Sequence, residues 1–237
     1  MSVTELIKRK RFAPGKGVTE LPPEQGIRRF GFILWTHLSK LVILNLLLIA
    51  FSIPVVTMPA ALCGVNRVLI KLVREGNCFL WSDFWQEFKA NLVKALPFGL
   101  FTAFLLFDSY YALSVSTSGG GILPGALGLF LLGMAVLFGS YAFVLLPSLD
   151  LKGKYITKNT FILMMTEWKT NLAILGCALA LGALIAAIFP YSAILMLFIS
   201  FSLMQLIICT AVNGPLQRRI IAPYEQRQKE GSESWQA

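Results

Sequence analysis

Two long runs without a basic residue constrain this chain more than any other feature of its sequence. Thr170–Gln217 contains no Asp, Glu, Lys, Arg or His, and Ala95–Leu149 contains one carboxylate, Asp108, and no basic residue. A helix crosses the hydrocarbon layer, about 30 Å thick, in about 20 residues, so each run is long enough for two crossings and a turn. The sequence therefore predicts an all-α, polytopic integral membrane protein.

Composition agrees with this class and limits the partners. Of the 237 residues, 56% are hydrophobic and 14% are charged, against about 25% charged in soluble domains. The net charge of +9 would suggest nucleic acid in a soluble protein. Here the basic residues lie at the ends of apolar segments, so lipid headgroups and topology explain them better. We expect a single membrane domain that binds the lipid bilayer and no nucleic acid.

Six apolar segments are separated by residues that break helices. Pro54, Ser116–Gly121 and Pro190 mark three turns. The segments cover about 32–53, 55–73, 92–115, 122–147, 172–189 and 191–212, between a basic segment 1–31 and a tail 213–237. The pattern predicts three helical hairpins within a transmembrane domain 32–212.

The basic residues alternate with these turns along the chain. All but Lys40, Arg67 and Lys71 lie in residues 1–31, 74–94, 152–169 and 218–229, whereas the three turns have none. With six crossings, every basic stretch and both termini are cytoplasmic, as the positive-inside bias requires. Five crossings would place the basic N-terminus outside. Arg67 and Lys71 weaken segment 55–73, and we expect them to snorkel to the headgroups. The alternative is a half-inserted segment that returns on the same side.

A short motif occurs twice, 80 residues apart. Glu87-Phe88-Lys89-Ala90-Asn91-Leu92 recurs as Glu167-Trp168-Lys169-Thr170-Asn171-Leu172. In each copy the apolar residues have the spacing of one helical stripe; they are Trp81, Phe84, Trp85, Phe88 and Leu92, then Phe161, Met164, Met165, Trp168 and Leu172. We predict an amphipathic cytoplasmic helix in the headgroup region at each copy. The candidate partner contacts are Glu87, Lys89, Asn91, Glu167, Lys169 and Asn171. The alternative is that the two copies reflect only the amphipathic segment that commonly precedes a membrane helix.

Four residues within or between the segments are candidates for function or packing. Asp108 is an intramembrane carboxylate, although its place near the outer interface favours an interfacial role over binding or proton coupling. Asn45 is expected to form an interhelical hydrogen bond. Pro54 and Thr57 are expected to shape the first external turn, with a broken helix that contacts substrate as the alternative. Small residues recur at Ala178, Gly182 and Ala186, a stripe suited to close helix packing.

Motifs of the common hydrolytic enzymes are absent from the sequence. The chain has no P-loop, no H-E-x-x-H and no G-x-S-x-G with suitable partners, and these carry nucleotide, zinc and serine chemistry respectively. His37 is the only histidine, and the four cysteines are far apart. We therefore expect no enzymatic activity, no metal and no cofactor.

Several short segments of the N-terminal half resemble the YesL family of bacterial multi-pass membrane proteins, which has no assigned biochemical activity. They are Leu44-Asn45-Leu46, residues 52–57, residues 71–74, residues 83–91, and Asp108 with Tyr110-Tyr111. The resemblance implies a plasma-membrane protein connected with carbohydrate uptake or its regulation. We therefore expect an accessory or regulatory component whose partners are subunits of an ATP-driven sugar importer. The alternatives are a transporter or channel, and a scaffold or lipid-binding sensor that uses Lys8–Arg11.

Overall fold

The computed structural model describes residues 27–149, 151–188, 191 and 196–223, and every element within them is a helix. Five helices are long and apolar enough to cross a membrane, and a bent pair is a sixth candidate. The five are Val55–Glu75, Leu96–Gly120, Ile122–Ser148, Trp168–Ala187 and Phe198–Ile221. The all-α, polytopic prediction is confirmed for this part of the chain. Lys8–Arg11, Pro190 and residues 224–237 lie outside the described residues.

The first apolar segment is bent. Helices α2 (Ile27–Thr36) and α3 (Leu38–Ser52) meet at His37, and the pair is bent by 81°. The predicted segment 32–53 is therefore divided at His37, and its longer part is α3. Arg29 gives the physical reason, because its Nε donates a hydrogen bond of 3.1 Å to the carbonyl of Val73. This carbonyl lies at the C-terminal end of α4, where the helix leaves acceptors open. The contact holds α2 beside that end.

Helix α4 (Met58–Glu75) follows the short turn η1 (Val55–Thr57) and ends at Gly76, whose φ of 76° favours glycine. Helix α5 (Leu80–Asn91) then runs back along α4. Gly64 permits the close approach, since a Cβ there would lie 2.8 Å from Cδ2 of Phe84. Phe84 is fully buried. The predicted orientation of this stripe toward lipid is therefore wrong for Phe84, which packs on protein.

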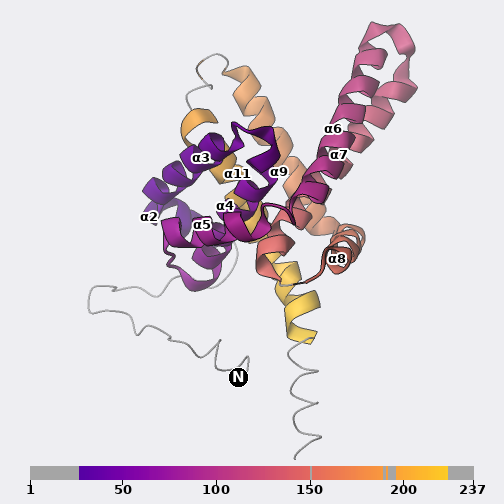
Figure 1. The fold of residues 1–237 in the computed structure, drawn as a ribbon. Helices are drawn as coiled ribbons and strands as arrows, with labels where there is room; N and C mark the ends of the chain where they lie inside the picture. The colour runs from indigo at the N-terminus through magenta and orange to yellow at the C-terminus, as the bar shows by residue number, and fades with distance from the viewer. Residues whose placement is uncertain (1–26, 150, 189–190, 192–195, 224–237) are drawn as a thin grey trace, which may run out of the picture.

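Helices α6 (Leu96–Val115) and α7 (Ile122–Ser148) form an antiparallel hairpin that projects from the rest of the molecule (Figure 1). Between them lies η2 (Ser116–Gly120), and positive φ at Gly119 and at Gly121, the residue that follows η2, turns the chain. Ser109 Oγ donates a hydrogen bond of 2.8 Å to the Gly128 carbonyl across the hairpin.

The second copy of the repeat is not one helix. Helix α8 (Gly153–Thr166) ends before Glu167, and α9 (Trp168–Ala187) begins after it. Glu167 has φ −105° and ψ 56°, outside the helical range. The predicted continuous stripe from Phe161 to Leu172 is therefore wrong. The chain ends with η3 (Met196–Ser200), α11 (Phe201–Leu216) and η4 (Gln217–Ile221).

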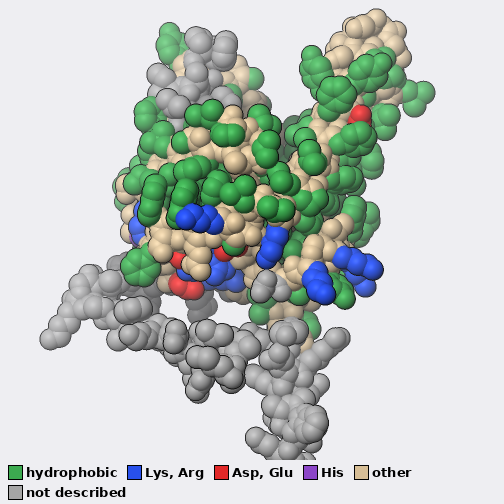
Figure 2. All heavy atoms as spheres, viewed as in Figure 1, with side chains coloured by type: hydrophobic (Ala, Val, Ile, Leu, Met, Phe, Trp, Pro, Cys, Tyr) green, Lys and Arg blue, Asp and Glu red, His purple; other side chains and the backbone are tan. Residues whose placement is uncertain are grey.

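The core lies where α3, α4, α7 and α11 meet. Helix α9 contributes little to it, because only 6% of its apolar window is buried. Nothing lies within 4 Å of a Cβ built at Gly182, so the small-residue stripe does not pack closely at this residue within the described chain. On the face drawn in Figure 2, Lys and Arg side chains gather in the lower half, and apolar side chains cover the upper half.

Candidate functional site

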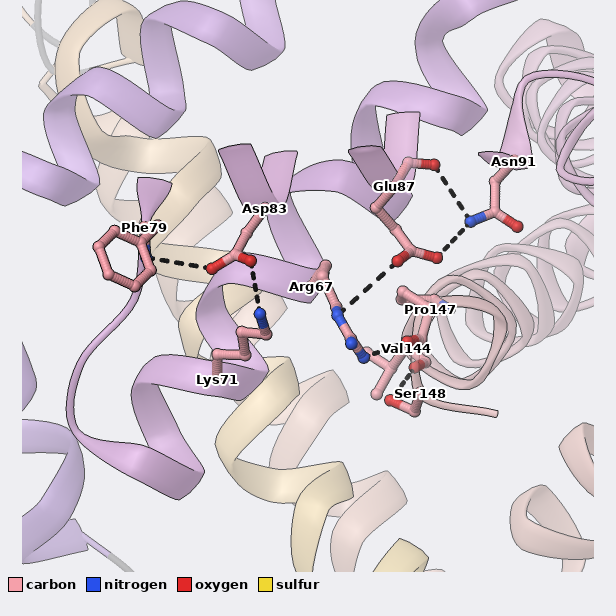
Figure 3. A network of polar contacts seen from close by, with 9 residues as sticks. All are labelled: Arg67, Lys71, Phe79, Asp83, Glu87, Asn91, Val144, Pro147 and Ser148. Carbon is pink, nitrogen blue, oxygen red and sulfur yellow. Dashed lines mark hydrogen bonds and ion pairs between the residues drawn. The ribbon is translucent and has the colours of Figure 1, made fainter. Parts of the chain in front are cut away.

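A four-residue group of opposite charges joins α4 to α5, and we call it the charge ladder. Arg67 and Lys71 lie one turn apart on α4, and Asp83 and Glu87 lie one turn apart on α5. Because the helices are antiparallel, the groups pair in two rungs (Figure 3). Lys71 Nζ lies 2.5 Å from Asp83 Oδ1, and Arg67 Nε lies 3.7 Å from Glu87 Oε2. The basic residues of segment 55–73 are therefore paired with carboxylates of α5, and their snorkelling to the headgroups stays a prediction.

Two adjacent side chains of α4 also bind the end of α7. Pro147 has no N–H, so the carbonyl of Phe143, four residues earlier, lacks its helical donor. Asn66 Nδ2 donates a hydrogen bond of 2.9 Å to that carbonyl. Arg67 Nη1 donates one of 2.9 Å to the carbonyl of Pro147 (Figure 3). The proline predicts an open carbonyl, but the sequence does not show that Asn66 supplies the donor.

Glu87 and Asn91 are occupied within the chain. Asn91 Nδ2 donates a hydrogen bond of 2.6 Å to Glu87 Oε1, and the Glu87 side chain is only 18% exposed. Burial raises the pKa of the Glu87 carboxyl, and the nearby Arg67 guanidinium opposes that rise. Both residues were predicted to face a partner. The structure places them in the contact between α4 and α5, and their contact with a partner stays a prediction.

The equivalent residues of the second copy are occupied in a different way. Tyr141 Oη donates a hydrogen bond of 2.7 Å to Asn171 Oδ1, and Asn171 Nδ2 donates to the carbonyl of Met164. Glu167 forms ion pairs with Arg219 and Arg218. These contacts attach the corner between α8 and α9 to α7 and to η4. Glu167 and Asn171 therefore also join elements within the chain, and their contact with a partner stays a prediction.

The two lysines of the motif are exposed, and tryptophans that are exposed or half-buried lie beside them. Lys89 Nζ lies 4.8 Å from the centre of the Trp85 ring, and Lys169 Nζ lies 5.7 Å from that of Trp168. Trp81 stacks on Trp85 at 6.3 Å, and Trp81 and Trp168 are 62% and 65% exposed. We call Trp81, Trp85 and Lys89 the tryptophan–lysine surface. Of the six predicted partner contacts, Lys89 and Lys169 are the two that face outward.

The remaining candidates lie apart from the ladder. Asn45 is fully buried and accepts a hydrogen bond of 2.9 Å from the Ser202 N–H, which is the predicted interhelical bond. Thr57 Oγ1 donates one of 2.8 Å to the carbonyl of Pro54 within the turn. Asp108 is half-buried on α6, and within the described residues no hydrogen bond or ion pair joins it to Asn45 or Thr57.

Among the described residues, no group of three or more His, Cys, Asp or Glu side chains is placed so that it could hold a metal ion. A shallow, open hollow lies at the tip of the α6–α7 hairpin, lined by Ser114, Val115, Ser118, Gly119 and Gly120.

The Tyr141 hydroxyl supplies a test of the corner contact. Tyr141 is fully buried, so Tyr141→Phe leaves Asn171 Oδ1 without its donor and is expected to cost about 1–2 kcal/mol of unfolding free energy. Unfolding in mixed SDS–maltoside micelles measures the loss. Tyr155→Phe is the control, because Tyr155 is 54% exposed, and its effect should stay within about 0.5 kcal/mol. Equal effects of the two changes would contradict this role for Tyr141.

Comparison with known proteins adds one match. The family model described as "Protein of unknown function, DUF624" matches residues 41–112. Neither the curated proteins nor the solved structures gave a match. The matched residues run from α3 to α6, and they include all four members of the charge ladder. Residues 41–112, less than half of the chain, are thus similar to a family whose function is unknown.

Proposed function

We propose that this protein is a non-enzymatic component of the bacterial plasma membrane, with both termini in the cytoplasm. In this role it assists or regulates carbohydrate uptake or utilisation by contact with subunits of an ATP-driven importer. The resemblance of residues 44–111 to the YesL family supports the link to carbohydrate. The basic residues support the orientation, since those on the face in Figure 2 gather at one end and basic ends are typically cytoplasmic.

The tryptophan–lysine surface carries the proposal. Polar side chains that could have faced a partner are used to join helices, as Glu87 and Asn171 are. Trp81 instead remains 62% exposed beside Trp85 and Lys89. Exposed tryptophan is enriched at protein interfaces and dominates their binding energy. The surface therefore has the composition expected of a docking site for another protein.

Co-purification tests this function. The tagged protein, expressed at its native level, is extracted with a mild detergent, and permease and ATPase subunits are identified in the eluate by mass spectrometry. We expect recovery of these subunits to fall at least tenfold in Trp81→Ala with Lys89→Glu, because a central tryptophan typically contributes 2 kcal/mol or more. Ser82→Ala and Gln86→Ala, exposed residues of the same helix, are the matched controls. Purification as a lone species would contradict the proposal.

A transporter is the second candidate, and Asp108 is the observation that favours it. This carboxylate is half-buried in an apolar helix, and charged groups in such places often mark an ion or substrate path. Flux of labelled sugars into reconstituted vesicles, lost in Asp108→Asn, would favour this candidate over the accessory role. Absence of flux for every solute tested would argue against it.

A further inference from the structure

The turn between α3 and α4 lies near the base of the α6–α7 hairpin, where α6 begins and α7 ends. A Cβ built at Gly99 would lie 2.2 Å from Cγ of Pro59, so the first turn of α4 touches the first turn of α6. Gly99 is three residues, about 4.5 Å, from the start of α6. Phe98 of α6 stacks on Phe138 of α7, so Phe138 lies at about the same height as Gly99. From Phe138 to the start of α7 at Ile122 is 16 residues, about 24 Å.

A contact in the middle of α4 also places this helix beside the base of the hairpin. Arg67 reaches the carbonyl of Pro147, one residue before α7 ends. Eight further residues of α4, about 12 Å of helix, follow Arg67 up to and including Glu75. Helix α4 therefore lies beside the base of the α6–α7 hairpin and not beside its tip. It begins about one turn above the start of α6, and its last eight residues extend beyond the point at which Arg67 contacts the end of α7.

The residues of this turn suit hydrocarbon rather than water. Ile53, Val55 and Val56 are 79%, 79% and 63% exposed. The single hydroxyl proton of Thr57 is shared between the carbonyls of Phe51 and Pro54, which both lie within hydrogen-bond distance of Oγ1. The Thr57 N–H also donates to the Pro54 carbonyl. Such pairing is what non-helical backbone needs where water is absent.

An outer-surface position for this turn would have a large cost. If the membrane ended at the level of Pro59, about 24 Å of hairpin would extend into water. That part of the hairpin includes exposed apolar side chains, among them Phe104, Phe107, Ile122, Leu123 and Phe130. Contiguous apolar surface of this size is rare on water-exposed protein. The bilayer must therefore cover the upper hairpin as well.

We propose that the α3–α4 turn, residues 53–57, is inserted into the hydrocarbon layer from the side at which α6 begins and is covered there by lipid acyl chains. Helices α3 and α4 then enter and leave on that same side. The charge ladder lies at the headgroup boundary, level with the end of α7, where paired charges cost least. The crossings are made by α6, α7, α9 and the η3–α11 helix, which keeps both ends of the chain on one side.

Site-directed labelling tests this inference. Val55→Cys and Val56→Cys are each made in a Cys78→Ser, Cys177→Ala background and reconstituted in vesicles of phosphatidylethanolamine and phosphatidylglycerol. Ser118→Cys, at the hairpin tip, is the matched control. The inference predicts that a membrane-impermeant maleimide labels Ser118→Cys at least tenfold faster than either turn variant, from whichever side it is added. A nitroxide at 55 should collide readily with oxygen and rarely with a water-soluble nickel chelate.

Either of two results would overturn the inference. One is rapid labelling of Val55→Cys from the side that labels Ser118→Cys, which would make the turn an outer loop. The other is rapid labelling from the opposite side with high nickel accessibility, which would place the turn in water. Two turn variants are used so that poor folding of one does not decide the result. The outcome is independent of importer binding.

Discussion

Arg67→Met is expected to lower the free energy of unfolding by about 2–3 kcal/mol. The change removes the donor to the Pro147 carbonyl and leaves Glu87, whose side chain is 18% exposed, without its cation. Losing one partner of a fully buried pair costs about 3–5 kcal/mol. The Arg67 side chain is 37% exposed, so solvent reduces that figure. Unfolding in mixed SDS–maltoside micelles measures the effect.

The loss should depend on pH in a defined direction. Burial already raises the pKa of Glu87, and Arg67 opposes the rise, so its removal raises the folded-state pKa further. A carboxyl with a higher pKa in the folded state binds more protons there, and acid therefore favours folding. Arg67→Met should lose less stability at pH 5 than at pH 8. Addition of Glu87→Gln should recover part of the loss, since no unpaired carboxylate remains. A loss no larger than that of Lys89→Met, an exposed cation, would contradict the ladder.

Gly64→Ala is expected to have the second large effect, about 1–3 kcal/mol of destabilisation from overpacking. The new Cβ would lie 2.8 and 2.9 Å from two ring carbons of Phe84 and 3.1 Å from its carbonyl oxygen. Phe84 is fully buried and in contact with Phe51 and Phe88, so the ring has little room to move. The same micelle unfolding assay, with tryptophan fluorescence as the probe, reports the loss.

Gly182→Ala is the matched control for this substitution. It also places a methyl group on a helical glycine, but no atom lies within 4 Å of the new position. Alanine is favoured over glycine inside a helix by about 0.5–1 kcal/mol, so this variant should be as stable as the natural protein or more so. If Gly64→Ala proved equally harmless, the close contact of α4 with α5 would not exist as described.

The apolar runs predict the helical class because the hydrocarbon layer fixes the length of a crossing. The fourth predicted segment, 122–147, corresponds closely to α7 (Ile122–Ser148). The bend at His37 escaped prediction because it depends on Arg29 reaching Val73, 44 residues away. Hydropathy is averaged over neighbouring residues, so it gives no information about contacts between residues far apart in the sequence.

The charge ladder could have been predicted from the sequence. Arg67 and Lys71 are four residues apart, as are Asp83 and Glu87, and a short connection makes the two helices antiparallel neighbours. That spacing places two opposite charges on facing turns. The hydrogen-bond partner Tyr141 of Asn171 could not be predicted, because the two residues meet only where α7 packs beside α9. Candidate sites thus became structural contacts where tertiary packing joined distant residues.

Placement in the bilayer is the central claim, and two labelled positions test it most directly. Ser118→Cys lies in η2, and Lys158→Cys lies on exposed α8 at the other end of α7. With an impermeant maleimide on intact cells, Ser118→Cys should react at once, and Lys158→Cys should react only after the membrane is opened. Reaction of Lys158→Cys on intact cells, or protection of Ser118→Cys until the cells are opened, would contradict the account.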